Sequence, residues 1–264
     1  MQVTSRDATG TTTDKFNCSV CPVRDHAVCS RCNPEEFEQF KAIRRIRSFS
    51  KGAHIMRAGE PMTSVGSLTR GSAYLRRSLE DGRRQMVGLL MPGDFIGRPG
   101  RREVAFDIIA GTEVQLCQFR IGDFERILQA SPAVSRRLLE MTLDELDAAR
   151  LWMLVLGRAT SRERLTSLFA LLVQHDARHM SRKIGISAKI ELPFARSDIA
   201  EFLGLTIETV SRRFSDLQGD GLIRIEGRRK ILIPDYLALI AETGDSESWR
   251  HEFHGEVCLS SAVE

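Results

Sequence analysis

The sequence predicts an α+β protein that consists of a small antiparallel β-domain, a long helix and a C-terminal winged helix-turn-helix. Between Phe49 and Phe119, short apolar stretches alternate with glycine-containing turns, a texture typical of a small barrel or sandwich. From Ser131 a helical pattern continues to about Gly157. A helix-turn-helix pattern and a basic hairpin follow, and these three observations together define the fold class.

Composition indicates a soluble globular protein. Of 264 residues, 42% are hydrophobic and 28% are charged, which argues against disorder throughout. We find no apolar run long enough for a membrane span, and the first residues carry no secretory signal, so we expect a cytoplasmic protein. The net charge of +3 is small, but basic residues cluster toward the C-terminal part, as a nucleic-acid contact face requires.

Changes in pattern along the chain predict its organisation. Pro34 to Ile46, Ile121 to Ala130 and Ser161 to His175 have helical spacing of apolar residues, and Ile184 to Leu192 suits an extended segment. The expected parts are a disordered arm (1–16), a cysteine-rich segment (17–33), the β-domain (34–130), the long helix (131–158), the winged helix-turn-helix (159–235) and a polar tail (236–264).

The long helix has two interpretations. Ser131 suits its cap and Pro132 its first position. Its apolar residues form a nearly heptad seam: Leu139, Leu143, Leu146, Ala149, Met153 and Leu156. At 1.5 Å per residue it is roughly 35–40 Å long, more than a small β-domain needs, which favours a dimer over packing on its own domain. An acidic stripe (Glu140, Asp144, Asp147) would either repel its copy or lie in solvent.

The segment from Phe194 to Phe214 matches a helix-turn-helix. Gly204 suits the turn, where a positive φ favours glycine, and Thr206 can cap the second helix. We expect Leu205 to fill the space between the two helices. The inward positions of the two helices are Ile199, Ala200, Leu203, Ile207, Val210 and Phe214.

The outward face of the second helix is the candidate reading head. Arg212 can bind guanine with two hydrogen bonds, Glu208 can accept from cytosine, and Ser211 can contact a thymine or a phosphate. The alternative is an ordinary pair of helices with a charged face, but a hairpin with a basic tip follows and suits phosphates. The DNA-binding candidates are Arg196, Glu208, Thr209, Ser211, Arg212, Arg213, Arg228 and Arg229.

At this point the sequence resembles a known family. Leu205 to Arg212 looks like the recognition-helix signature of the CRP/Fnr superfamily, and the likeness covers roughly residues 18 to 234. The glycine turns of the β-domain, such as Leu68 to Gly71 and Pro92 to Asp94, are similar to its cyclic-nucleotide-binding-like β-roll. Glu208, Ser211 and Arg212 match the Fnr branch.

The resemblance implies a parallel homodimer, a palindromic site of the TTGAT-N4-ATCAA type and contact with RNA polymerase. The turn from Leu79 to Arg84 lies where the family's activating loop touches the polymerase. The family's cyclic-nucleotide branch uses an Arg-Ser or Arg-Thr pair, which is missing after Gly97, so we expect no cyclic nucleotide.

The cysteines resemble those of the oxygen-sensing Fnr subgroup. Cys18-x2-Cys21-x7-Cys29 precedes the β-domain, and Cys117 lies in its last strand. Members of that subgroup hold a [4Fe-4S] cluster with three N-terminal cysteines and one from the β-roll. The resemblance therefore implies Cys18, Cys21, Cys29 and Cys117 as ligands, with Cys32 as an extra or substitute thiol.

Spacing alone leaves an alternative open. Four cysteines from Cys18 to Cys32 also suit a zinc site, in which case Cys117 is a buried core thiol and the chain a winged-helix regulator without oxygen sensing. An enzyme using either metal centre is the third class, but we find no catalytic Ser/His/Asp set, HExxH motif or phosphate-binding glycine loop. Cys258 has no assigned role.

Overall fold

A computed structural model describes residues 17–179 and 183–250 of the chain. The chain divides into two compact units, Met1–Met141 and Thr142–Glu264, and the division falls inside the long helix α3 (Pro132–Arg158). The predicted α+β class is confirmed. The division lies within the helical segment that we predicted at residues 131–158. The predicted arm 1–16 and Cys258 lie outside the described residues.

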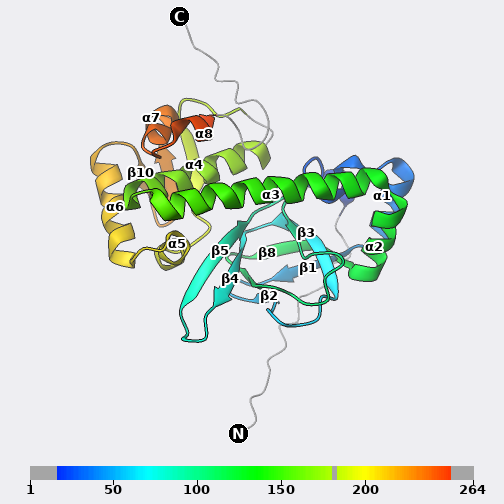
Figure 1. The fold of residues 1–264 in the computed structure, drawn as a ribbon. Coiled ribbons are helices and arrows are strands. Elements are labelled where there is room, and N and C mark those ends of the chain that lie inside the picture. The colour runs from blue at the N-terminus through cyan, green and yellow to red at the C-terminus, as the bar shows by residue number, and fades with distance from the viewer. Residues whose placement is uncertain (1–16, 180–182, 251–264) are drawn as a thin grey trace, which may run out of the picture. The chain divides into compact units, whose positions relative to one another are not determined.

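The first unit contains two antiparallel four-stranded sheets (Figure 1), in the orders β1-β8-β3-β6 and β2-β7-β4-β5. The strands are β1 (Arg45–Phe49), β2 (His54–Met56), β3 (Ser64–Arg70), β4 (Ala73–Ser78), β5 (Arg84–Leu90), β6 (Phe95–Ile96), β7 (Asp107–Ala110) and β8 (Val114–Arg120). Apolar side chains from both sheets fill the space between them, among them the fully buried Leu68 and Leu116. The predicted small sandwich is therefore confirmed.

Two short helices flank the β-roll. α1 (Pro34–Ile43) begins as predicted: Asn33 and Glu36 form a capping box, and Pro34 takes the first position. The helix ends at Ile43, so our prediction to Ile46 was too long; Ile46 lies in β1, opposite Cys117 of β8. α2 (Ile121–Ala130) has the predicted bounds. The cysteine-rich segment before α1 forms two 3-10 turns, η1 (Cys18–Val20) and η2 (Val28–Arg31).

A second apolar cluster joins these helices to the sheet. The ring centroids of Phe40 in α1 and Phe119 in β8 are 5.2 Å apart, and Phe124 of α2 lies 5.7 Å from Phe119. Val28 of η2 is buried in the same cluster, and Cys29 and Cys117 pack against it. This cluster holds the cysteine-rich segment against the outer face of β8.

α3 is one unbroken helix in Figure 1. The Oγ of Ser131 accepts a hydrogen bond from the Val134 N–H at 3.2 Å, so Ser131 caps the helix as predicted. Of the predicted seam, Leu139, Leu143, Leu146, Ala149 and Met153 are exposed and Leu156 is half-buried. The helix thus presents an apolar stripe to solvent in the single chain.

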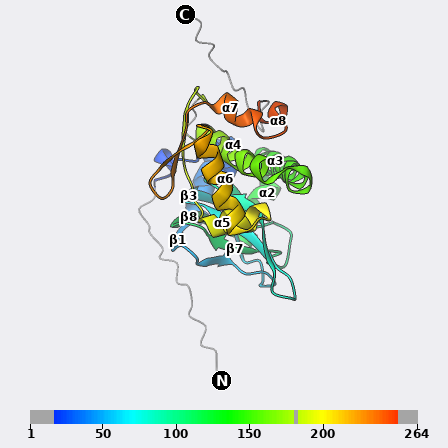
Figure 2. The ribbon, with the colours of Figure 1, turned by 90° about the vertical axis from the view of Figure 1, so that its left-hand side faces the viewer.

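The second unit contains the C-terminal helices (Figure 2) and one antiparallel sheet in the order β10-β11-β9. Its elements are α4 (Ser161–His179), β9 (Ala188–Glu191), α5 (Arg196–Leu203), α6 (Ile207–Gly219), β10 (Arg224–Glu226), β11 (Lys230–Ile233), α7 (Tyr236–Ala241) and α8 (Ser246–Arg250). The predicted helix-turn-helix and hairpin are both present. α4 extends past the predicted end at His175.

The predicted polar tail from residue 236 was wrong for residues 236–250. Tyr236, Leu239, Ile240 and Trp249 are buried, and they belong to α7 and α8. The backbone carbonyl of Trp249 accepts a hydrogen bond from the Gln174 side chain of α4 at 2.8 Å. The prediction gave too little weight to the apolar run of α7, Tyr236–Ala241, whose residues Tyr236, Leu239 and Ile240 pack in the core while Leu237 stays 40% exposed.

Candidate cysteine centre and DNA-binding surface

Four cysteines from two distant parts of the sequence line one cavity. Cys18 lies in η1, Cys21 caps that turn, Cys29 lies in η2 and Cys117 lies in β8. All four are half-buried free thiols. The remaining lining residues are Val23, Arg24, Ala27, Val28, Phe37, Ser67, Thr69 and Phe119. The wall is therefore mostly apolar, with Arg24 as its one cationic member; its guanidinium lies 3.8 Å from the centroid of the Phe37 ring.

Burial is the main influence on the ionisation of the thiols that line the cavity. Burial raises the pKa of Cys29 to about 11, and the neighbouring Cys21 and Cys18 raise it further in the same direction. Burial also raises the pKa of Cys117 strongly, again helped by Cys29, Cys18 and Cys21. The raised pKa values of Cys21, Cys29 and Cys117 disfavour their ionisation, and a positively charged metal centre suits such a site because a metal ion keeps its thiol ligands deprotonated.

Cys32 is close to Cys29 but does not line the cavity. It packs in the aromatic cluster around Phe40. Burial raises its pKa to about 12, with Cys29 and Glu36 as the next causes. Among residues 17–179 and 183–250, no three His, Cys, Asp or Glu side chains are grouped closely enough to hold a single metal ion.

The helix-turn-helix has the local geometry that its sequence predicts. Gly204 ends α5 with φ +63°, a left-handed conformation that favours glycine. The Thr206 hydroxyl accepts a hydrogen bond from the Thr209 N–H at 3.1 Å and so caps α6. Val210 and Phe214 are buried as expected. Ile207 is 49% exposed, so its predicted inward position was wrong; it lies in the first turn of α6, beyond the reach of the core.

The reading-head candidates differ in their freedom to reach DNA. Glu208, Ser211 and Arg212 are exposed on one face of α6. A backbone hydrogen bond and, next, a hydrogen bond with the Thr206 side chain lower the pKa of Glu208. The Glu208 carboxylate is therefore ionised at neutral pH and can only accept hydrogen bonds. Thr209 is half-buried, with its hydroxyl 3.0 Å from that of Thr206.

Two of the predicted DNA-binding arginines already have partners within the unit. Arg213 forms an ion pair with Asp216 at 2.7 Å, and the Arg196 guanidinium lies 3.4 Å from the centroid of the Phe214 ring. Desolvation lowers the pKa of Arg196. In the wing, Gly227 turns the hairpin with φ +86°, Arg228 is exposed and Arg229 is half-buried.

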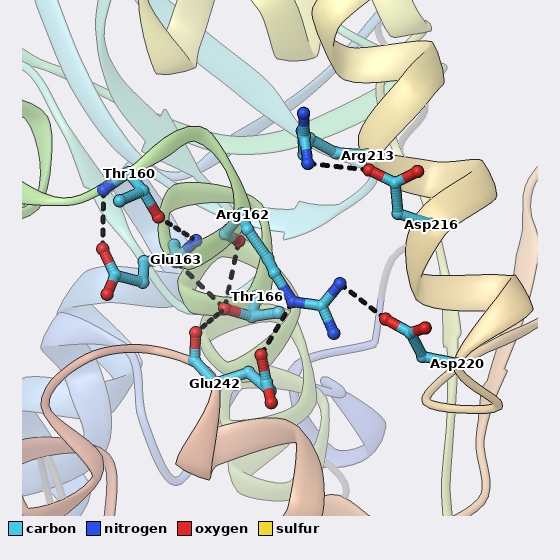
Figure 3. Close-up of polar contacts among 8 residues, drawn as sticks. All are labelled: Thr160, Arg162, Glu163, Thr166, Arg213, Asp216, Asp220 and Glu242. Atoms are coloured by element: carbon cyan, nitrogen blue, oxygen red, sulfur yellow. Dashed lines mark hydrogen bonds and ion pairs between the residues drawn. The ribbon is translucent and has the colours of Figure 1, made fainter.

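An arginine that the sequence analysis missed supports the recognition helix from behind (Figure 3). Arg162 of α4 pairs with Asp220 at the end of α6 and with Glu242 after α7, each at 2.7 Å. The Thr166 hydroxyl, fully buried, lies 2.8 Å from the Glu242 carbonyl oxygen. Sequence offers no signal for such long-range pairs. It does offer one for the capping box of α4, Thr160-x-x-Glu163, which we overlooked.

The polymerase-contact candidate, residues 79–84, comprises the turn between β4 and β5 and the first residue of β5. Leu79 is 53% exposed, and Arg83 pairs with Asp81 at 2.8 Å.

On α3, Asp147 pairs with Arg150 and Glu140 with Arg137, so two acids of the predicted acidic stripe have partners on their own helix. None of the helices within the described residues is long and apolar enough to span a bilayer.

Comparisons with known proteins match both units. The model of the cyclic nucleotide-binding domain matches residues 46–131, and that of the Crp-like helix-turn-helix domain matches residues 163–242. The transcriptional activator protein FnrL of Cereibacter sphaeroides is 48% identical over 228 residues, covering 86% of this chain and 92% of the relative. The nitrogen fixation regulation protein FixK of Bradyrhizobium diazoefficiens is 39% identical over 210 residues, covering 79% and 86%.

A solved structure with a similar fold agrees with these sequence matches. FixK2 from Bradyrhizobium japonicum has a TM-score of 0.68 and 29% identity, covering 76% of this chain and 97% of that protein. A β-roll, a long helix and a winged helix-turn-helix together define a DNA-binding transcription regulator, not an enzyme. The chain belongs to the CRP/Fnr family and is a transcriptional activator of its Fnr/FixK group.

Proposed function

We propose that this activator responds to oxygen through a [4Fe-4S] cluster held by Cys18, Cys21, Cys29 and Cys117. The observation that carries the proposal is that these four thiols line one cavity although Cys117 lies far from the others in sequence. Four thiolates are the ligand set of such a cluster. When bound, the cluster supplies a group that oxygen dismantles, in a cavity whose wall is mostly apolar and whose four thiols are half-buried.

The alternative is a zinc site made by Cys18, Cys21, Cys29 and Cys32. Tetrahedral zinc with Zn–S bonds of about 2.3 Å needs its four sulfurs within about 4 Å of one another. Neither the position of Cys32 outside the cavity nor the spacing of the thiols among residues 17–179 and 183–250 suits one ion. A cluster, in which each thiolate binds a different iron, tolerates wider spacing. These observations favour the cluster.

The exposed seam of α3 supports a homodimer. Leu139 is 58%, Leu143 51% and Met153 74% exposed, on one stripe of one helix. Burying such a stripe against a second copy is the ordinary way to remove it from water. In our proposal an intact cysteine centre favours the parallel dimer, and its loss in air releases the monomers.

The dimer places two reading heads on one duplex, so we expect it to bind a palindrome. Glu208, Ser211 and Arg212 of each copy read half-sites of the TTGAT-N4-ATCAA type, and the exposed Arg228 holds a phosphate. The turn of residues 79–84 contacts RNA polymerase at the promoter. A regulator of this kind works in the cytoplasm, where its thiols stay reduced.

The deciding experiment measures iron, sulfide and zinc per chain after strictly anaerobic purification. The variants are Cys117→Ala and, as the matched control, Cys32→Ala. Iron and sulfide that disappear with Cys117→Ala but remain with Cys32→Ala support the proposal. One zinc per chain without sulfide, dependent on Cys32 and indifferent to Cys117, contradicts it and leaves a zinc-stabilised regulator. The molecular mass of the protein in solution, measured before and after exposure to air, tests the dimer. A dimer that persists in air contradicts its dependence on oxygen.

A further inference from the structure

One side chain of α3 holds the cysteine-rich segment at its midpoint. Arg137 donates a hydrogen bond from a guanidinium nitrogen to the backbone carbonyl oxygen of His26 at 2.6 Å. His26 lies between Cys21 and Cys29, on the loop that joins two walls of the cysteine cavity. The Arg137 side chain is only 17% exposed, so this bond is sheltered from water. A charged donor on a sheltered carbonyl is among the stronger hydrogen bonds of a protein.

Glu140, one turn along the same helix, completes the connection. Its carboxylate lies 3.4 Å from Arg137 and 3.7 Å from Arg31, which lies between Cys29 and Cys32. The Arg31 pair is solvent-exposed and therefore weak, so the Arg137 bond dominates. Both contacts reach the segment of residues 26–31, which carries one cysteine of the cavity.

The turns of α3 around Arg137 have one side packed against the aromatic cluster and another side exposed to solvent. Leu138 and Met141 pack in the cluster that also contains Cys29 and Cys117. Leu139, beside Arg137 in sequence, is exposed and begins the apolar seam. A displacement of this part of the helix therefore moves the seam together with the side chains that touch the cysteine segment.

The environment of Arg137 suits a coupling role better than a purely stabilising one. Its Nε is buried and has no hydrogen-bond partner among the described residues, which is a cost to the folded state. The bond it does make is to a backbone oxygen whose position depends on how the Cys21–Cys29 loop is folded. A side chain of this kind senses the conformation of the loop rather than the identity of its residues.

We propose that Arg137 is the positioning residue that transmits the state of the cysteine centre to α3, and through α3 to dimerisation. The inference rests on the proposed function, in which the filled centre favours the dimer. With the centre filled, the loop presents the His26 carbonyl to Arg137 and fixes the first turns of α3. With the centre empty, the carbonyl moves and the helix loses this restraint.

The test compares the dimer dissociation constant of the cluster-free and cluster-loaded chain, measured anaerobically by sedimentation. The coupling is the ratio of the two constants. In Arg137→Gln we expect normal iron and sulfide content but a ratio reduced roughly 10- to 100-fold, the range of one charge-assisted hydrogen bond. Arg137→Lys, which keeps a charged donor, should retain part of the ratio. The control is Arg136→Gln, its exposed neighbour on the helix, which should keep the wild-type ratio.

Each other outcome has a distinct meaning. If Arg137→Gln changes both dissociation constants equally, the residue is merely structural and the proposal is overturned. If the variant loses its iron, Arg137 belongs to the binding site and the proposal is equally overturned. A large wild-type ratio that Arg137→Gln keeps overturns this proposal alone. A wild-type ratio of one overturns the proposed function, and the coupling proposal with it.

Discussion

Gly66 is the position where the structure makes the sharpest prediction about the cysteine centre. It lies in β3, opposite Gln118 of β8, and a Cβ built there would lie 2.5 Å from the carbonyl oxygen of Cys117. The next nearest atoms, at 3.1 and 3.2 Å, also belong to the backbone of β8. No flexible side chain can yield, so in Gly66→Ala the strand itself has to move.

The expected cost follows from two opposing effects. Overpacking destabilises the folded variant by about 1–3 kcal/mol. Alanine also lowers the conformational entropy of the unfolded variant, which stabilises the fold by about 0.4–1 kcal/mol. We therefore expect Gly66→Ala to lower the free energy of unfolding by about 1–2 kcal/mol. Gly122→Ala is the matched control. Gly122 lies in α2 with no atom within 4 Å of its added Cβ, so this change should stabilise the chain by about 0.4–1 kcal/mol.

Urea unfolding of the cluster-free chain, followed by circular dichroism, measures both changes. Hydrogen exchange of peptides from β3 and β8 locates the effect of Gly66→Ala. Both tryptophans, Trp152 and Trp249, lie in the second unit, so their fluorescence is an internal reference. A Gly66→Ala chain as stable as wild type, or one whose faster exchange lies away from β8, refutes the reasoning.

Three further predictions concern the two sites and their support. Arg212→Ala should cost about 1–3 kcal/mol of binding and relax specificity at one guanine, whereas Arg228→Ala should weaken binding evenly and lower the salt slope by about one; DNA titrations at several salt concentrations distinguish these results. Arg162→Met breaks two ion pairs of a half-buried side chain and should lower the free energy of unfolding, measured with urea, by about 1–3 kcal/mol. The control Lys189→Met removes an exposed pair and should change it by less than about 1 kcal/mol. Equal effects of the two changes contradict the supporting role of Arg162. Burial raises the pKa of Cys29 from 9.0 to about 11, so the unfolded chain releases the Cys29 proton first as the pH rises. The free energy of unfolding of the cluster-free chain should therefore be unaffected by this thiol below pH 9 and should fall between pH 9 and 11. Urea midpoints that fall equally steeply in Cys29→Ala contradict this cause.

Sequence reasoning succeeded where structure depends on neighbours in the chain. Gly204, Thr206 and Val210 act through a turn, a cap and a helical face, each defined within a few residues, and all three are as predicted. It failed at Ile207, whose spacing is that of a core residue although no core lies opposite the first turn of α6. The partner of Arg213 was also missed, because an exposed arginine and one in an ion pair look the same in sequence.

Long-range features required the fold itself. In the order β1-β8-β3-β6, β1 pairs with β8 although more than sixty residues separate them, and no periodicity encodes that choice. The bracing of α6 by Arg162 through Asp220 and Glu242 is of the same kind, since its members come from three separate elements. A periodic sequence pattern indicates which face of a helix or strand is apolar, but not which other element packs against that face.

Cys117 shows how the register of a sheet decides what spacing could not. Leu116 is fully buried between the two sheets, and Cys117, pointing to the opposite face of β8, packs in the outer aromatic cluster beside Cys29. A slip of β8 by one residue would place the Cys117 thiol in the interior of the roll and Leu116 in the cysteine cavity. The fourth cysteine therefore joins the other three only when β8 is correctly paired with β1 and β3. Any metal centre that needs Cys117 is for that reason linked to folding of the first unit, so the stability lost in Gly66→Ala should also appear as weaker binding of that centre.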